Sequence, residues 1–156
     1  VVVPWLHQIG KPIQLLGKGR SGIVTKNMWE GQEVVVKKFA LQEDDPRSVF
    51  DVYKHECKVL VELQSLWGEH VPRLLFRQPW RTSPVIGLQL GERLHDDMST
   101  WEPEDLTKAK ETIAKVAALG WVQKDMRGSN FVRLCNGKQY WIAMVDFESV
   151  EKIKAP

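Results

Sequence analysis

The sequence predicts an α+β fold with two lobes, and two observations support this prediction. The N-terminal half consists mainly of short β-branched segments separated by glycines, which is the pattern of antiparallel strands. After Gly91 the pattern changes to one long helical segment, a polar loop and a short hairpin. We therefore expect one domain over residues 1–156, with a small lobe of about 1–90 and a reduced second lobe of about 91–156.

Each element is indicated by its own local pattern. Five segments of the N-terminal half have the composition of strands: 13–17, 22–28, 33–39, 72–76 and 84–90. Apolar residues at helical spacing predict a helix over 48–66, which Gly68 ends. A second helix is expected over 103–119, with Thr100 as its cap and acidic residues in its first turn. The hairpin is predicted to pair 131–134 with 140–145.

Composition narrows the class of protein. The chain has 156 residues, a net charge of +2 and basic residues that are interleaved with acidic ones, so we expect no nucleic-acid binding. No apolar run approaches the roughly 20 residues of a membrane span, so we expect no membrane association. Residues 1–5 lack the charged start of a signal peptide and indicate an excised domain. The two distant cysteines, Cys57 and Cys135, predict buried free thiols and an intracellular location.

A glycine-rich segment, Gly17-Lys18-Gly19-Arg20-Ser21-Gly22, lies between two predicted strands. A dinucleotide-binding fingerprint would be followed by a helix, whereas here a β-branched strand containing Val24 follows. Glycines allow backbone amides to approach phosphate groups closely, because no Cβ intervenes. Taken alone, the segment is more typical of an ordinary glycine-rich β-turn than of a phosphate-binding loop.

A lysine and a glutamate are predicted to face the same interior. Strand alternation places Val35 and Lys37 on one face of a very apolar strand. Glu56 lies on the apolar stripe of the first predicted helix, where a carboxylate is costly unless it is paired. We therefore expect an ion pair between Lys37 and Glu56.

The remaining polar motifs lie in the second half. The loop Gln123-Lys124-Asp125-Met126-Arg127-Gly128-Ser129-Asn130 has an asparagine five residues after an aspartate, and Asp146-Phe147-Glu148 follows an apolar strand end. In this order and spacing, the glycine-rich segment, lysine, glutamate, loop and Asp-Phe-Glu resemble the motifs of the protein-kinase-like superfamily over residues 14–150. The resemblance implies a two-lobed protein-kinase-like fold that binds ATP and Mg²⁺ between its lobes.

The resemblance also implies a role for each motif. Asp125 would face the acceptor hydroxyl and receive its proton, and Arg127 would reach the γ-phosphate. Asn130 and Asp146 would be the metal ligands. Lys37 would position the phosphates and Glu56 would orient Lys37. The remaining nucleotide-binding positions implied are Gly17, Lys18, Gly19, Gly22, Val24 and Val35.

Three positions depart from the family pattern. Gln123 replaces a histidine that packs and forms hydrogen bonds within the loop, Lys124 replaces an arginine, and Glu148 replaces the glycine of Asp-Phe-Gly. These departures and the reduced second lobe resemble atypical kinase-like families: lipopolysaccharide-type and small-molecule kinases, and above all the kinase-like domains of Crinkler-type effectors from oomycetes and fungi. The latter resemblance implies a secreted effector that acts inside a host cell.

The sequence thus predicts an ATP- and Mg²⁺-dependent phosphotransferase. A Ser/Thr protein kinase that acts on a protein substrate or on itself is the first reading of the resemblance. One alternative is a kinase-fold module that binds a nucleotide or a partner without transferring phosphate. Another is a small-molecule kinase, which would share every catalytic residue and differ only in the acceptor. The oligomeric state is left open.

Overall fold

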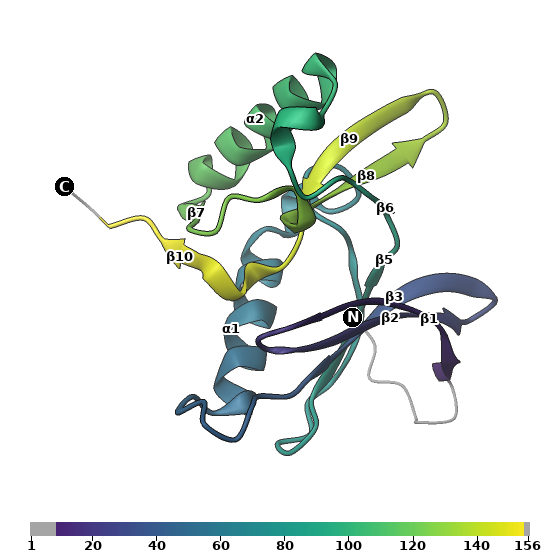
Figure 1. Cartoon of the computed structure of the whole chain (residues 1–156), viewed down its shortest axis with the longest axis vertical. Helices are drawn as coiled ribbons and strands as arrows, with labels where there is room; N and C mark the ends of the chain where they lie inside the picture. Colours follow the sequence, from purple (N-terminus) through teal and green to yellow (C-terminus); the bar gives the residue numbers. More distant parts are fainter. Residues whose placement is uncertain (1–8, 155–156) are drawn as a thin grey trace. The chain divides into compact units, whose positions relative to one another are not determined.

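The computed structural model describes residues 9–154, and over these residues the fold combines two α-helices with antiparallel sheets (Figure 1). The N-terminal segment 1–5 discussed above lies outside the described residues. The chain divides into two compact units, which are described separately. The first unit contains the residues up to Cys57 together with Leu74–Leu90, and the second contains Lys58–Arg73 together with the residues from Gly91 onward.

The first unit is built on a five-stranded sheet in the order β1-β2-β3-β5-β4, and every neighbouring pair is antiparallel. Its strands are β1 (Ile9–Gly19), β2 (Gly22–Trp29), β3 (Gln32–Phe39), β4 (Leu74–Gln78) and β5 (Val85–Gln89). The five predicted strands are therefore confirmed. The first is longer than predicted, because β1 keeps its pairing with β2 through several register shifts, one of them beside Pro12.

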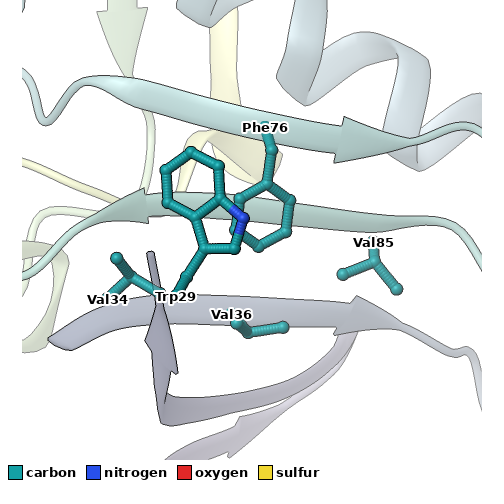
Figure 2. Close-up of a cluster of buried hydrophobic side chains, with 5 residues drawn as sticks. All are labelled: Trp29, Val34, Val36, Phe76 and Val85. Carbon is teal, nitrogen blue, oxygen red and sulfur yellow. The ribbon is translucent and has the colours of Figure 1, made fainter. Parts of the chain in front are cut away.

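One face of this sheet is closed by an apolar cluster of Trp29, Val34, Val36, Phe76 and Val85, which Figure 2 shows. The rings of Trp29 and Phe76 are 5.0 Å apart between centroids. Phe76 also covers Gly87, where an added Cβ would collide with its ring. Because side chains alternate along β3, this packing leaves Lys37 on the opposite face of the sheet.

Helix α1 (Val49–Glu62) contributes residues 49–57 to the first unit. There Tyr53 packs edge-on against Phe39 of β3, with 5.6 Å between the ring centroids. The helix predicted over 48–66 is confirmed, but it ends earlier than expected and a 3₁₀ turn follows over Gln64–Leu66.

The second unit contains β6 (Glu92–Arg93), α2 (Pro103–Ala118), β7 (Trp121–Gln123), β8 (Phe131–Asn136), β9 (Gln139–Met144) and β10 (Val150–Lys152). The predicted helix and hairpin are confirmed as α2 and β8–β9. Strand β6 joins the hairpin, while β10 pairs with β7. The cap prediction is wrong, since Thr100 ends a separate 3₁₀ turn and Glu102 precedes α2. Within residues 9–154, neither helix has the length and apolar character that a membrane span requires.

A buried histidine joins three segments of the second unit. His70 Nδ1 lies 2.7 Å from Thr112 Oγ1 on α2, and the Thr112 hydroxyl donates to the carbonyl of Ile142 on β9. The Thr112 oxygen must therefore accept the Nδ1–H of His70, which fixes the neutral tautomer. The His70 carbonyl accepts from the Met144 amide at 2.9 Å. This network fixes β9, the strand that leads to Asp146.

Burial lowers the pKa of His70 below its ordinary value of 6.5, although Glu111 and Glu69 oppose this shift and Lys115 adds to it. The unfolded chain therefore binds more protons than the native protein as the pH falls below about 6.5. We expect the free energy of unfolding to decrease between pH 7 and pH 5, and His70→Asn to reduce this slope. Urea denaturation of both proteins across that range tests this prediction, and equal slopes would contradict it.

Candidate functional site

Three of the predicted nucleotide-binding residues of the first unit lie in one row across its sheet. Gly17 on β1 pairs with Val24 on β2, which pairs with Lys37 on β3, which in turn pairs with Ile86 on β5. Directly paired residues of neighbouring antiparallel strands lie on the same face. Val35, two residues before Lys37, shares this face and is half-buried, as is Val24. One face of the sheet therefore presents a lysine beside apolar side chains. The lysine is in register with residues of the two strands that flank the glycine-rich turn.

Lys37 and Glu56 form the ion pair that the sequence predicts. The distance between Lys37 Nζ and Glu56 Oε1 is 2.7 Å, and the two side chains are only 7% and 1% exposed. Lys37 Nζ also lies 4.9 Å from the centroid of the Phe39 ring, which belongs to the same face of β3. Removing both charges from water is costly, and a buried pair is weak support for stability. The burial of this pair is therefore not by itself evidence that it stabilises the fold.

The glycine-rich segment forms the hairpin between β1 and β2. Gly22 has a φ of +156°, and an added Cβ would collide with the carbonyl of Lys38, so local packing requires glycine here. At Gly17 and Gly19, an added Cβ would meet none of the described atoms within 4 Å. Packing among the described residues thus explains Gly22 but not the other two glycines. Lys18 is exposed between them.

The cysteine that follows Glu56 has an unreactive thiol. Burial raises the pKa of the Cys57 thiol to about 11, so this thiol stays protonated at neutral pH and is a poor nucleophile. Both Cys57 and Cys135 are free thiols, as expected. Cys135 is exposed, however, and the expectation that both would be buried is wrong for it, because it lies near the tip of the β8–β9 hairpin.

The predicted loop residues of the second unit are held together by Gln123, which is 4% exposed. Its Oε1 accepts from the backbone amide of Asp125 at 3.1 Å, and its Nε2 donates to the carbonyl of Asp146 at 3.1 Å. One side chain therefore connects the two segments that bear the predicted catalytic and metal-binding aspartates. The glutamine forms hydrogen bonds within the loop as expected, but the sequence did not indicate its bond to Asp146, because Asp146 lies on a distant segment.

Asn130 is also placed by the loop. Its Nδ2 donates to the carbonyl of Asp125 at 2.7 Å, and its backbone carbonyl accepts from the Val145 amide at 2.8 Å. Because the amide nitrogen makes the first bond, the amide oxygen is directed to the other side of the carboxamide. That oxygen and the exposed carboxylate of Asp146 are the kind of hard donors that Mg²⁺ prefers, so the residues present fit the predicted metal.

Asp146 has an unusual backbone. It lies in the left-handed region at φ 62° and ψ 84°, at the point where β9 gives way to the 3₁₀ turn Phe147–Ser149. A non-glycine residue in this region costs about 1–2 kcal/mol. Hydrogen bonds on both sides maintain it, from Val145 to Asn130 and from Gln123 to the Asp146 carbonyl. Strain of this kind often marks positions whose side chain must point in one direction.

Arg127 contacts the predicted catalytic aspartate directly. Its Nε donates to Asp125 Oδ1 at 2.9 Å, and the two side chains are 57% and 40% exposed. An exposed pair of this kind contributes little to stability. It does fix the orientation of the Asp125 carboxylate and bring a guanidinium beside it, so that the loop presents a cation and an anion together.

The connecting role of Gln123 leads to a stability prediction. Gln123→Leu removes a donor and an acceptor from a buried position while keeping a side chain of similar size. We expect the free energy of unfolding to fall by about 1–3 kcal/mol, because the Asp125 amide and the Asp146 carbonyl lose their partner. Gln123→His retains a donor and an acceptor and should lose less. Urea denaturation checks both variants, and Gln139→Leu on the exposed hairpin is the control; equal losses at the two glutamines would contradict the prediction.

The structure therefore collects the predicted residues into two groups, one in each compact unit. The first unit holds Gly17, Lys18, Gly19, Gly22, Val24, Val35, Lys37 and Glu56, and the second holds Asp125, Arg127, Asn130 and Asp146. No protein-family model matches this chain, and a search of curated proteins found no match either.

Proposed function

We propose that the protein is an ATP- and Mg²⁺-dependent phosphotransferase whose acceptor is a Ser/Thr hydroxyl of a protein or of the protein itself. The observation that supports this most is the buried Lys37–Glu56 pair at 2.7 Å, in the same sheet row as Gly17 and Val24. A structural role explains this costly pair poorly, whereas an ammonium held ready for an anionic ligand explains it well. The proposal includes the two-lobed kinase-like fold with a reduced second lobe.

In the proposed reaction, Lys37 binds the phosphates, and Glu56 keeps the ammonium in place when no ligand is bound. Amides of the β1–β2 hairpin approach the phosphates at Gly17 and Gly19, where the structure leaves space for a side chain. Val24 and Val35 supply the apolar surface on which the base rests. These residues bind and orient the nucleotide without reacting with it, as expected for a reaction that depends on positioning and electrostatics.

The loop of the second unit provides the remaining functions. Asp125 receives the proton of the acceptor hydroxyl while the hydroxyl oxygen forms a bond to the γ-phosphorus. The bond between that phosphorus and the β-γ bridging oxygen breaks, so that ADP leaves. Arg127, now paired with Asp125, compensates negative charge on the transferred group. Asn130 and Asp146 would hold Mg²⁺, which neutralises charge on the phosphate oxygens when it is bound.

Two observations favour a second candidate function, a kinase-fold module that binds nucleotide without transferring phosphate. Asp125 Oδ1 already accepts a hydrogen bond from Arg127, so the guanidinium competes with an acceptor hydroxyl for this carboxylate. Glu148, where the family has glycine, lies within a 3₁₀ turn whose Ser149 carbonyl accepts from the Lys124 amide. If these contacts persist with ligand bound, the loop would bind but not react.

A γ-phosphate transfer assay with radiolabelled ATP and Mg²⁺ tests the proposal. It should be run on the protein alone, with a general protein acceptor such as casein, and with a panel of small hydroxyl compounds. Label on protein supports the proposal, and label on small compounds alone would make the protein a small-molecule kinase. Thermal stabilisation by Mg·ATP without any transfer would establish the binding module instead. Absence of both would overturn the nucleotide site itself.

A further inference from the structure

We propose that Asp96 is a positioning residue that holds the loop bearing Asp125 and Asn130 in its working conformation. Asp96 lies in the segment between β6 and α2, far from this loop in sequence, and no motif singles it out. The effect on catalysis rests on the proposed function. The effect on the conformation of the loop does not, and it can be measured separately.

Asp96 binds two consecutive amides of the loop. Its backbone carbonyl accepts from the Gly128 amide at 2.8 Å, and its Oδ1 accepts from the Ser129 amide at 3.1 Å. Together these two hydrogen bonds form the Asp96 contact. They lie at the start of the 3₁₀ turn Gly128–Asn130, where backbone amides have no partner within the turn. Hydrogen bonds from Ser129 also lower the pKa of the Asp96 carboxyl, so the acceptor is ionised at neutral pH.

The residue at position 128 must be glycine for this contact to form. An added Cβ at Gly128 would collide with the carbonyl of His95 and lie 2.7 Å from the carbonyl of Asp96. Gly128 is buried and its φ is not in the left-handed region, so close approach and not backbone conformation requires glycine here. The two backbones are therefore packed directly against each other.

The segment that contains Asp96 is itself fixed to the body of the second unit. The indole Nε1 of Trp101 donates to the carbonyl of His95 at 2.8 Å. Trp101 is 8% exposed and packs edge-on against Phe131, the first residue of β8, with 5.9 Å between centroids. Asp97 caps the following 3₁₀ turn through the Ser99 amide at 3.0 Å. Asp96 is thus presented from a fixed support, and the contact can restrain the loop.

The Asp96 contact acts on the site through Asn130. The 3₁₀ turn that it stabilises ends at Asn130, whose Nδ2 binds the carbonyl of Asp125. If the turn loosens, the loop no longer holds Asn130 and Asp125 in fixed positions relative to each other. The ion pair of Lys37 and Glu56 in the first unit is unaffected. Loss of Asp96 should therefore reduce kcat while leaving the KM for ATP nearly unchanged.

Two measurements on Asp96→Ala test this inference, with Glu102→Ala as the control of equal charge: Glu102 is exposed in the same segment before α2, and its side chain makes no cap hydrogen bond. Amide hydrogen exchange followed by NMR needs no activity: we expect the Ser129 amide to exchange about tenfold faster in Asp96→Ala, since its charged acceptor is gone. In the transfer assay we expect kcat to fall about tenfold with little change in KM. Asp96→Asn keeps an oxygen acceptor and should restore most of both values.

The outcomes separate the two proposals. Unchanged exchange of Ser129 in Asp96→Ala, or an equal acceleration in Glu102→Ala, would overturn the assignment to Asp96 whatever the activity. Faster exchange confined to Asp96→Ala would support the positioning role even if the wild-type protein transferred no phosphate, and in that case only the proposed function would fail. A rise in KM as large as the fall in kcat would contradict the stated route through Asn130.

Discussion

Replacing Asp125 by alanine is expected to lower γ-phosphate transfer by about 10²–10⁴-fold, because in the proposed reaction the acceptor hydroxyl loses the group that takes its proton. The side chain is partly exposed and its best-defined contact is with Arg127, so its removal should cost the fold little. ATP affinity should be retained, since Lys37 and the glycine-rich hairpin, which bind the phosphates in the proposed reaction, belong to the other unit. Steady-state transfer rates and Mg·ATP binding by calorimetry, measured on the same preparations, check both parts.

The neighbouring residue provides the control for this variant. Met126 is 45% exposed in the same loop and has no role in the proposed chemistry, so Met126→Ala should transfer phosphate at close to the wild-type rate. A loss in Met126→Ala as large as that in Asp125→Ala would show that any change in the loop is disruptive. Undiminished transfer by Asp125→Ala would remove Asp125 from the mechanism altogether.

Much of the first unit could be predicted from sequence because its signals are local. The β-branched run of β3 indicates a strand, and the alternation of its side chains places Lys37 opposite the face that Val34 and Val36 close. A glutamate on the apolar stripe of α1 then indicates a partner for that lysine. These two signals predict the ion pair that the structure contains, and each signal lies within a few residues of sequence.

The second unit was harder to predict because its decisive contacts join distant segments. The three-residue strands β7 and β10 are too short to show alternation, and they are recognisable only by their pairing with each other. Gln123 gains its importance from Asp146, and Asp96 gains its importance from Ser129. Neither the secondary-structure propensity nor the hydrophobic periodicity of a segment predicts contacts with distant segments. The left-handed backbone of Asp146 is likewise imposed by its surroundings, since aspartate alone does not require it.

The ion pair itself leads to the second large prediction. Lys37→Met keeps an unbranched side chain on β3 but removes the ammonium 2.7 Å from Glu56, whose side chain is 1% exposed. We expect the free energy of unfolding to fall by about 3–5 kcal/mol, the usual cost of removing one partner of a buried pair. Lys38→Met is the matched control, because Lys38 is the next residue of the strand and is exposed; it should change stability by no more than about 0.5 kcal/mol.

The double variant Lys37→Met/Glu56→Leu separates stability from binding. Removing both charges should recover most of the stability lost in Lys37→Met, since two apolar side chains replace a pair whose desolvation was costly. It should not recover the stabilisation by Mg·ATP, because the phosphates would still lack their cation. A double variant that is stable and yet unresponsive to nucleotide would show that the pair is kept for its ligand. If Lys37→Met is as harmless as Lys38→Met, the expected cost of breaking this buried pair is wrong. If the double variant still binds Mg·ATP like the wild type, Lys37 does not bind the phosphates and the nucleotide site must be sought elsewhere.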